Sequence, residues 1–189
     1  MKDGRTESGF SLRPAAASEV RLAWLQRGVR STAARARFDV DPAVGTVVWH
    51  DERGKPTTFR TPRTAADPTA DDVLAEVCVA TQTQTGIFGL GDWRYLLLVN
   101  GQGRTVGRVH KQAAGAFDEM WGKAGLERLE SVGVRVAGRR FATVRDIERA
   151  HAGAVPRWWL HTAPYSWLIF TAVLVAALVA AVLLINAFD

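Results

Sequence analysis

The sequence predicts an α+β fold, with a small antiparallel β-meander, flanking helices and one C-terminal transmembrane helix. Short runs rich in β-branched and aromatic residues, joined by glycine-containing turns, occupy residues 38–136. Helical patterns follow these strands instead of alternating with them, which is typical of an α+β domain. Residues 166–186 contain no charged side chain and are long enough, as a helix, to cross a bilayer. We therefore expect one small domain with a membrane tether.

The N-terminal residues are expected to form a disordered segment and then a basic helix. Residues 1–17 lack apolar periodicity, and Ser18 can cap an amphipathic helix over 18–37. A basic helix of this kind can lie on anionic lipid headgroups. The candidate lipid contacts are Arg21, Arg27, Arg30, Arg35 and Arg37. Two other interpretations stay open, namely that the helix packs on its own domain or that it forms a nucleic-acid-binding arm.

Two β-hairpins are predicted in the cytoplasmic domain over residues 38–136. Residues 45–50 and 56–61 flank a polar loop that contains Gly54. The second hairpin surrounds the sequence Asn-Gly-Gln-Gly at residues 100–103, where Asn and Gly tolerate the positive φ of a tight turn.

The strand that precedes this second turn, residues 93–99, is apolar on both faces and should be central in its sheet. Upstream of it, residues 77–82 alternate as in a strand, with a helix over 70–80 as the alternative.

Helical spacing predicts a helix over residues 117–132, in one piece or broken near Gly122 and Gly125. Gly133 then stands where a helix C-cap belongs, and residues 134–136 are expected to form a last short strand.

Residues 137–165 are predicted to form a juxtamembrane helix and linker, in which Thr143 and Asp146 make a capping box. The order of elements is compatible with a pleckstrin-homology-like half barrel, by analogy of element order alone.

The segment 166–186 is interpreted as a transmembrane helix because its apolar residues leave no polar stripe on any side. Its large apolar side chains together contribute roughly −5 kcal/mol to the free energy of membrane insertion. Basic residues precede the segment and none follows it, so the domain should be cytoplasmic and the C-terminus outside. The expected anchors at the membrane interface are Arg157, Trp158, Trp159, Tyr165 and Trp167.

Small residues recur every four positions in this segment, at Ala172, Ala176 and Ala180. Such a stripe allows close approach of a second transmembrane helix. Another membrane protein, or a second copy of the chain, is therefore a candidate partner in addition to the lipid bilayer.

Charge and composition argue against a nucleic-acid partner. The net charge of +5 comes entirely from residues 1–37, because residues 38–189 carry equal numbers of acidic and basic side chains. Arginine outnumbers lysine twenty to four, a bias typical of GC-rich bacterial genomes. The single cysteine fits a reducing cytoplasm.

Catalytic, cofactor-binding and metal-ligating residues are not predicted. The four histidines are scattered without metal-ligand spacing, and Cys78 lies in an apolar run typical of inert core. We expect a single-pass, C-terminally anchored binding or scaffold module at the inner membrane surface. The alternatives are a small accessory subunit of a membrane complex, or an enzyme whose site uses His50, Asp51 or His110.

Overall fold

A computed structural model describes residues 8–15, 35–83, 92–122, 124–162 and 166–188 of the chain. The helix predicted over residues 18–37 lies almost entirely outside the described residues. Its predicted end is wrong, because Arg37 is the first residue of a strand. Antiparallel pairing with His50 of the neighbouring strand fixes Arg37 there.

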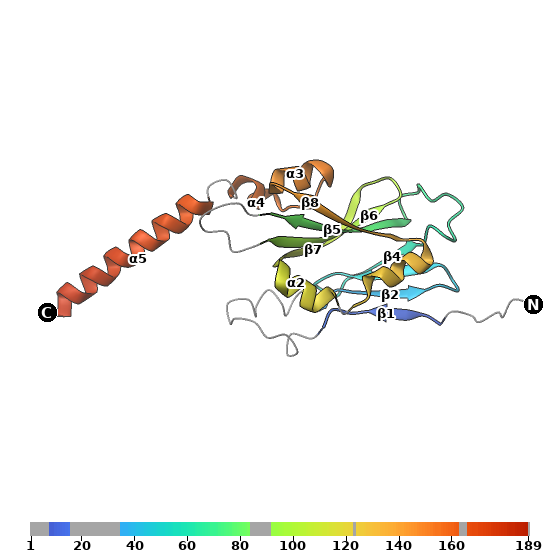
Figure 1. Cartoon of the computed structure of the whole chain (residues 1–189), viewed down its shortest axis with the longest axis horizontal. Helices are drawn as coiled ribbons and strands as arrows, with labels where there is room; N and C mark the ends of the chain where they lie inside the picture. Colours follow the sequence, from blue (N-terminus) through green and yellow to red (C-terminus); the bar gives the residue numbers. More distant parts are fainter. Residues whose placement is uncertain (1–7, 16–34, 84–91, 123, 163–165, 189) are drawn as a thin grey trace, which may run out of the picture. The chain divides into compact units, whose positions relative to one another are not determined.

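Unit 1, Met1–Ala154, contains two β-sheets, of which sheet A is an antiparallel meander (Figure 1). Its strands are, in spatial order, β1 (Phe10–Leu12), β2 (Arg37–Asp41), β3 (Thr46–His50) and β4 (Pro56–Arg60). Alternate residues of β2 and β3 are buried, so one face of the sheet packs inward. This sheet confirms the predicted meander, and β3–β4 is the hairpin predicted around Gly54.

Strand β1 lies within residues 1–17, for which the sequence predicted disorder. Leu12 is only 1% exposed, and the Ser11 hydroxyl donates a hydrogen bond to Asp39 Oδ1 at 2.6 Å. These contacts hold the short strand against β2. The prediction is wrong at residues 10–12, because a strand this short carries no periodicity that a sequence pattern could reveal.

Sheet B has the strand order β7–β6–β5–β8. Its strands are β5 (Leu74–Gln82), β6 (Trp93–Asn100), β7 (Thr105–Ala113) and β8 (Arg135–Phe141). Residues 74–80 are therefore strand and not helix. Strands β6 and β7 confirm the second predicted hairpin, and β6 is central, as its two apolar faces predicted.

Strand β8 pairs with β5 in parallel, which the sequence did not predict. A half barrel built from one meander contains no such pair, so the pleckstrin-homology-like arrangement is not the one that forms. β8 also continues to Phe141, and unit 1 continues to Ala154, beyond the domain end predicted at residue 136. The arginines of β8 resemble a polar linker in sequence, but charged side chains are also typical of an exposed edge strand.

The hydrophobic core lies between the two sheets and is closed on one side by α2 (Ala114–Trp121) and the 3₁₀ helix η3 (Leu126–Val132). Three aromatic rings from sheet A and α2 meet there. The ring centroids of Phe38 and Trp49 lie 4.6 Å apart, and those of Trp49 and Trp121 lie 6.5 Å apart. The helix predicted over 117–132 is thus broken, and Gly133 ends η3 with φ of 88°.

Helix α3 (Val144–Ala150) covers the outer face of sheet B, and its buried side chains Val144 and Ile147 lie on one side (Figure 1). The predicted capping box is confirmed. The backbone N–H of Asp146 donates to the Thr143 hydroxyl, and the backbone N–H of Thr143 donates to the Asp146 carboxylate. These bonds provide acceptors for backbone N–H groups that otherwise have no partner at the start of a helix.

Removal of this cap is expected to destabilise unit 1 moderately. Thr143→Ala should lower the free energy of unfolding by about 1 kcal/mol, because the hydroxyl acceptor of the cap is lost. Urea unfolding of the full-length protein in detergent measures the change. Thr143→Ser keeps the hydroxyl and should behave like the parent; equal losses in both variants would contradict the capping role.

Unit 2, Val155–Asp189, contains α4 (Arg157–Thr162) and α5 (Ser166–Phe188). The described side chains of α5 are exposed, including its large apolar ones. Within the residues that the structure describes, no helix meets the length and hydrophobicity that a membrane crossing requires. The transmembrane helix predicted over residues 166–186 therefore stays a prediction.

Candidate functional site

A cysteine and a histidine meet beneath α3. Cys78 Sγ, on the outer face of β5, lies 3.7 Å from Nε2 of His151, the C-cap residue directly after α3. Both side chains are buried, and the ring of Phe141 packs edge-on against the imidazole at 6.1 Å. This pair is the first candidate for chemistry, because a thiol beside an imidazole can form an activated nucleophile.

A carboxylate with two arginine partners lies next to this pair. Glu76, also on β5, is paired with Arg135 and with Arg139, whose Nη2 donates to Glu76 Oε1 at 3.0 Å. The carboxylate is only 6% exposed, whereas both guanidinium groups reach solvent. The bonds join β5 to β8, and thus stabilise the parallel strand pair.

The environment of Cys78 suppresses nucleophilic chemistry. Burial, and then the negative charge of Glu76, raise the pKa of the Cys78 thiol to about 11, although Arg139 and Arg135 act in the opposite direction. Burial and the charge of Arg139 lower the pKa of His151, whereas the charge of Glu76 acts in the opposite direction. A catalytic thiol requires a lowered pKa and access to solvent. The pair therefore belongs to the packing of α3 on β5.

Cys78 is expected to be inert in the folded protein. At pH 8 its reaction with a disulfide reagent should be about 100-fold slower than that of an exposed cysteine, because a pKa near 11 leaves little thiolate. Reaction rates measured with and without urea test this, with exposed Val44→Cys as the reference. Fast modification of Cys78 in the folded protein would contradict the assignment.

The solvent-facing side of sheet A gathers a serine, an aspartate and a histidine. Asp39 Oδ1 accepts from Ser11 and Asp39 Oδ2 accepts from Arg37 Nε at 2.9 Å, while His50 Nε2 lies 3.0 Å from the same carboxylate. Burial raises the pKa of Asp39, but the hydrogen bonds from Ser11 and Arg37 outweigh it and hold that pKa below its ordinary value.

This cluster does not have the arrangement of a catalytic triad. In a triad the serine bonds to the histidine, which the carboxylate orients from its other side. Here both Ser11 and His50 contact the carboxylate of Asp39, on the open face of a sheet. Among the other residues of the enzyme hypothesis, Asp51 accepts backbone N–H groups of its own turn, and the His110 side chain lies outside the described residues. Among the described residues, no three potential ligands are grouped to hold a metal ion.

Two shallow hollows occur on the described surface of unit 1. One, of about 550 Å³, lies between Arg63 and Glu130, and the other, of about 260 Å³, lies beside Arg140 and Thr83. The first is bridged by a hydrogen bond from Arg63 Nη1 to the Ser131 carbonyl at 2.7 Å. Neither hollow contains a histidine or the cysteine.

The predicted lipid-contacting arginines are only partly described. Arg21, Arg27 and Arg30 lie outside the described residues, and Arg35 is exposed just before β2. Arg37 lies on strand β2 of sheet A and is paired with Asp39. Its assignment to a face of an N-terminal helix is therefore corrected.

The predicted residues of the membrane interface lie in unit 2. Arg157, Trp158 and Trp159 begin α4, and the two indole rings contact each other edge-on at 5.6 Å. Tyr165 and the side chain of Trp167 lie outside the described part. Ala172, Ala176 and Ala180 all lie on α5 and are exposed, so the helix presents the predicted stripe.

Sequence reasoning missed the meeting of Cys78 with His151. One signal is present in the sequence, because Val144, Ile147 and His151 recur at helical spacing, which is typical of one buried helix face. What that face packs against depends on the parallel pairing of β8 with β5, which no local pattern encodes.

Fold and side chains thus define a small two-sheet α+β domain followed by a separate apolar helix. Comparison of the chain with protein-family models, with curated proteins and with solved structures finds no match.

Proposed function

We propose that this chain is a single-pass membrane protein, anchored by its C-terminal helix, whose α+β domain is a binding or scaffold module at the inner membrane surface. The observation that carries the proposal is the exposure of large apolar side chains around α5. Val173, Leu174 and Val175 are 64%, 49% and 52% exposed. Successive helix positions point about 100° apart, so these three side chains span about 200° of the circumference. Leu183, which is 63% exposed, points into the remaining arc.

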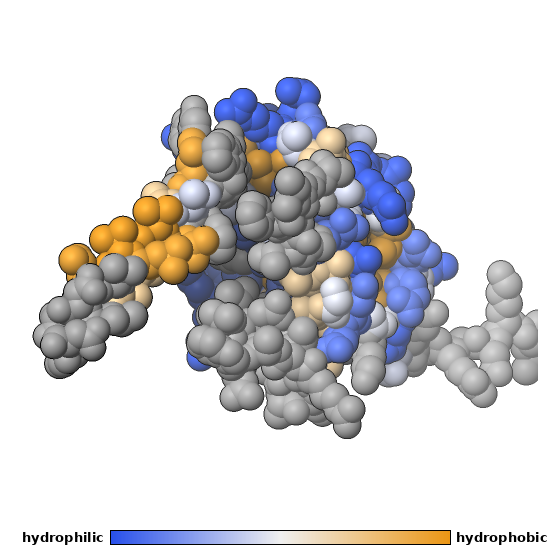
Figure 2. Space-filling model, turned by 60° about the vertical axis from the view of Figure 1, so that its left-hand side comes forward, coloured by the Kyte–Doolittle hydropathy of each residue, from blue (hydrophilic) through white to orange (hydrophobic). Residues whose placement is uncertain are grey.

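Lipid accounts for this exposure better than a protein groove does. A groove covers one face of a helix and leaves the opposite face in water, whereas lipid surrounds the helix completely. Figure 2 shows the described part of α5 as a continuous apolar surface. The sequence supports the same conclusion, because the uncharged run continues over residues 166–186. Burial of so much apolar surface needs a partner.

The flanking residues support a direction of insertion. Arginines precede α5, as at Arg149 and Arg157. Positively charged flanks tend to stay in the cytoplasm, which supports an orientation with unit 1 inside and the C-terminus outside. Exposed Trp158, next to Trp159, suits the headgroup layer, where amphipathic rings are favoured.

Extraction and labelling of the full-length protein test the proposal. The protein should remain in membranes washed with alkaline carbonate, and release into the wash would contradict the anchor. A cysteine at the C-terminus, Asp189→Cys, should react with a membrane-impermeant thiol reagent in intact cells. A cysteine on α3, Ala150→Cys, should react only after permeabilisation; the reverse result would contradict the orientation.

A second candidate function, an accessory subunit of a membrane complex, is supported by the exposed stripe of Ala172, Ala176 and Ala180. Small side chains let two helices approach closely within a bilayer. Crosslinking in mild detergent tests it, with Ala176→Leu expected to reduce the crosslinked species. A monomer with no crosslinked partner would contradict this candidate.

A further inference from the structure

We propose that the outer side of sheet B docks on the anionic phospholipid headgroups of the bilayer that α5 enters. The contact is made by the β8–α3 surface, defined as the exposed arginines Arg135, Arg139, Arg145 and Arg149. This inference rests on the proposed membrane anchor. It assigns the lipid contact to a folded surface of unit 1 and not to the N-terminal segment.

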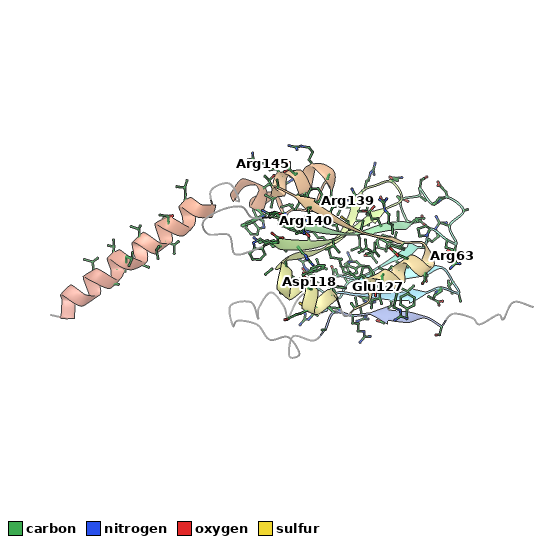
Figure 3. All side chains as sticks on the ribbon, viewed as in Figure 1. Arg63, Asp118, Glu127, Arg139, Arg140 and Arg145 are labelled. Atoms are coloured by element: carbon green, nitrogen blue, oxygen red, sulfur yellow. The ribbon has the colours of Figure 1, made fainter. Side chains whose placement is uncertain are left out.

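Charge is segregated within unit 1. Residues 38–134 carry ten basic and thirteen acidic side chains, whereas residues 135–154 carry five arginines and two carboxylates. Within residues 38–154, the excess of positive charge is thus concentrated on β8 and α3. Figure 3 shows Arg139 and Arg145 on this part of unit 1, and Asp118 and Glu127 on the α2–η3 part. A domain charged in this way orients its basic side toward an anionic surface.

The arginines of α3 are aimed away from the domain. Arg145 and Arg149 are four residues apart and thus share one face of the helix, opposite the buried Val144 and Ile147. Arg149 Nη1 bonds to Asp146 at 3.0 Å, yet its side chain remains 79% exposed. Asp146 is committed to the helix cap, and Glu148 accepts the backbone N–H of Gly153.

The arginines of β8 extend this surface. Arg135 and Arg139 share a single carboxylate, that of the buried Glu76, so one positive charge of the pair is uncompensated. Because Glu76 is enclosed beneath them, the guanidinium groups form the outer layer. Phosphate groups of lipids are well matched to such groups, since arginine donates hydrogen bonds in a planar fork.

The chain leaves unit 1 on this same side. Arg108, from β7, donates from Nη1 to the carbonyl oxygen of Gly153 at 2.6 Å, which fixes the exit next to α3. Residues 155–165 then connect unit 1 to α5, and a fully extended chain of this length reaches about 40 Å. The helical turns of α4 shorten this reach to about 30 Å. An anchored α5 therefore keeps the β8–α3 surface at high effective concentration near the headgroups.

Fluorescence quenching in nanodiscs tests the docking. Full-length protein labelled at Ala150→Cys on α3 is placed in discs of phosphatidylcholine alone or of phosphatidylcholine mixed with phosphatidylglycerol, each with a spin-labelled headgroup as quencher. The native Cys78 is buried and does not compete for the label. A second label at Val44→Cys, in the exposed β2–β3 turn of sheet A, reports on a different side of unit 1.

Quenching at Ala150→Cys is expected to increase in the anionic discs, and that at Val44→Cys to stay unchanged. Each arginine near an anionic surface contributes about a fivefold preference, so Arg145→Gln with Arg149→Gln should reduce the ratio of docked to free protein about 30-fold at low salt. The matched control, Arg53→Gln with Lys55→Gln, removes the same charge from a turn of sheet A and should change the ratio less than twofold.

Equal quenching in neutral and anionic discs, with the protein incorporated into both, would overturn the docking and leave the anchor standing. An equal loss in the control variant would also overturn it, because the effect would then reflect net charge and not this surface. Failure of the protein to enter either disc would contradict the proposed anchor, and the docking with it.

Discussion

Full-length protein that carries Val175→Arg and Leu178→Arg is expected to leave the membrane fraction. A charged side chain at the centre of a transmembrane helix costs about 3 kcal/mol, so the pair opposes insertion by about 6 kcal/mol. The apolar run favours insertion by roughly 5 kcal/mol in total. Both native side chains are exposed on α5, so the substitutions create no steric clash within the described chain. Carbonate extraction followed by flotation measures the change.

Single arginine substitutions distinguish a lipid environment of α5 from a protein groove that covers one face of the helix. Arginine at Val173, at Leu174 or at Val175 points to a different side of α5, and lipid should penalise all three similarly. A protein groove would penalise one or two of these substitutions and tolerate an arginine on the side of the helix that faces water. Val175→Leu with Leu178→Val keeps the hydrophobicity and should float like the parent. Membrane association that survives the two arginines would contradict the anchor.

Turn chemistry made the hairpins predictable from sequence. The Asn-Gly-Gln-Gly turn between β6 and β7 and the turn at Gly54 both rely on residues that accept positive φ, and Gly54 and Gly103 have φ of 79° and 76°. The cap at Thr143 was predictable for a similar reason, since both of its partners lie within one helical turn. Turns and caps of this kind depend only on residues that are close in sequence, so a sequence pattern can reveal them.

Long-range pairing was not predictable in the same way. The Glu76 carboxylate and Arg135 are far apart in sequence and meet only because β8 pairs with β5. The alternation of β8 is weak, because an edge strand that carries four polar or glycine positions lacks a clear apolar face. The contact of His151 with Cys78 and the position of the β8–α3 surface both follow from this one pairing. These two unpredicted features of sheet B thus share one cause.

The largest loss of stability in unit 1 is expected from Trp121→Ala. Trp121 is 1% exposed and packs against Phe38 and Trp49 of sheet A, so its removal leaves a cavity where α2 meets the sheet. Truncation of a buried tryptophan costs about 3–5 kcal/mol, a large fraction of the stability of a small domain. The buried thiol of Cys78 offers a direct readout, because it becomes reactive only when unit 1 unfolds.

The measurement is the urea concentration at which Cys78 becomes reactive in full-length protein in detergent. It should fall sharply in Trp121→Ala, because a stability loss at fixed m-value shifts the midpoint in proportion. Trp158→Ala is the matched control, since it makes the same chemical change at an exposed position of unit 2. Its free energy of unfolding should lie within about 0.5 kcal/mol of the parent, as for most surface substitutions, so its midpoint should barely move. If both variants unfold at the parental midpoint, the ring cluster between sheet A and α2 does not hold the core together.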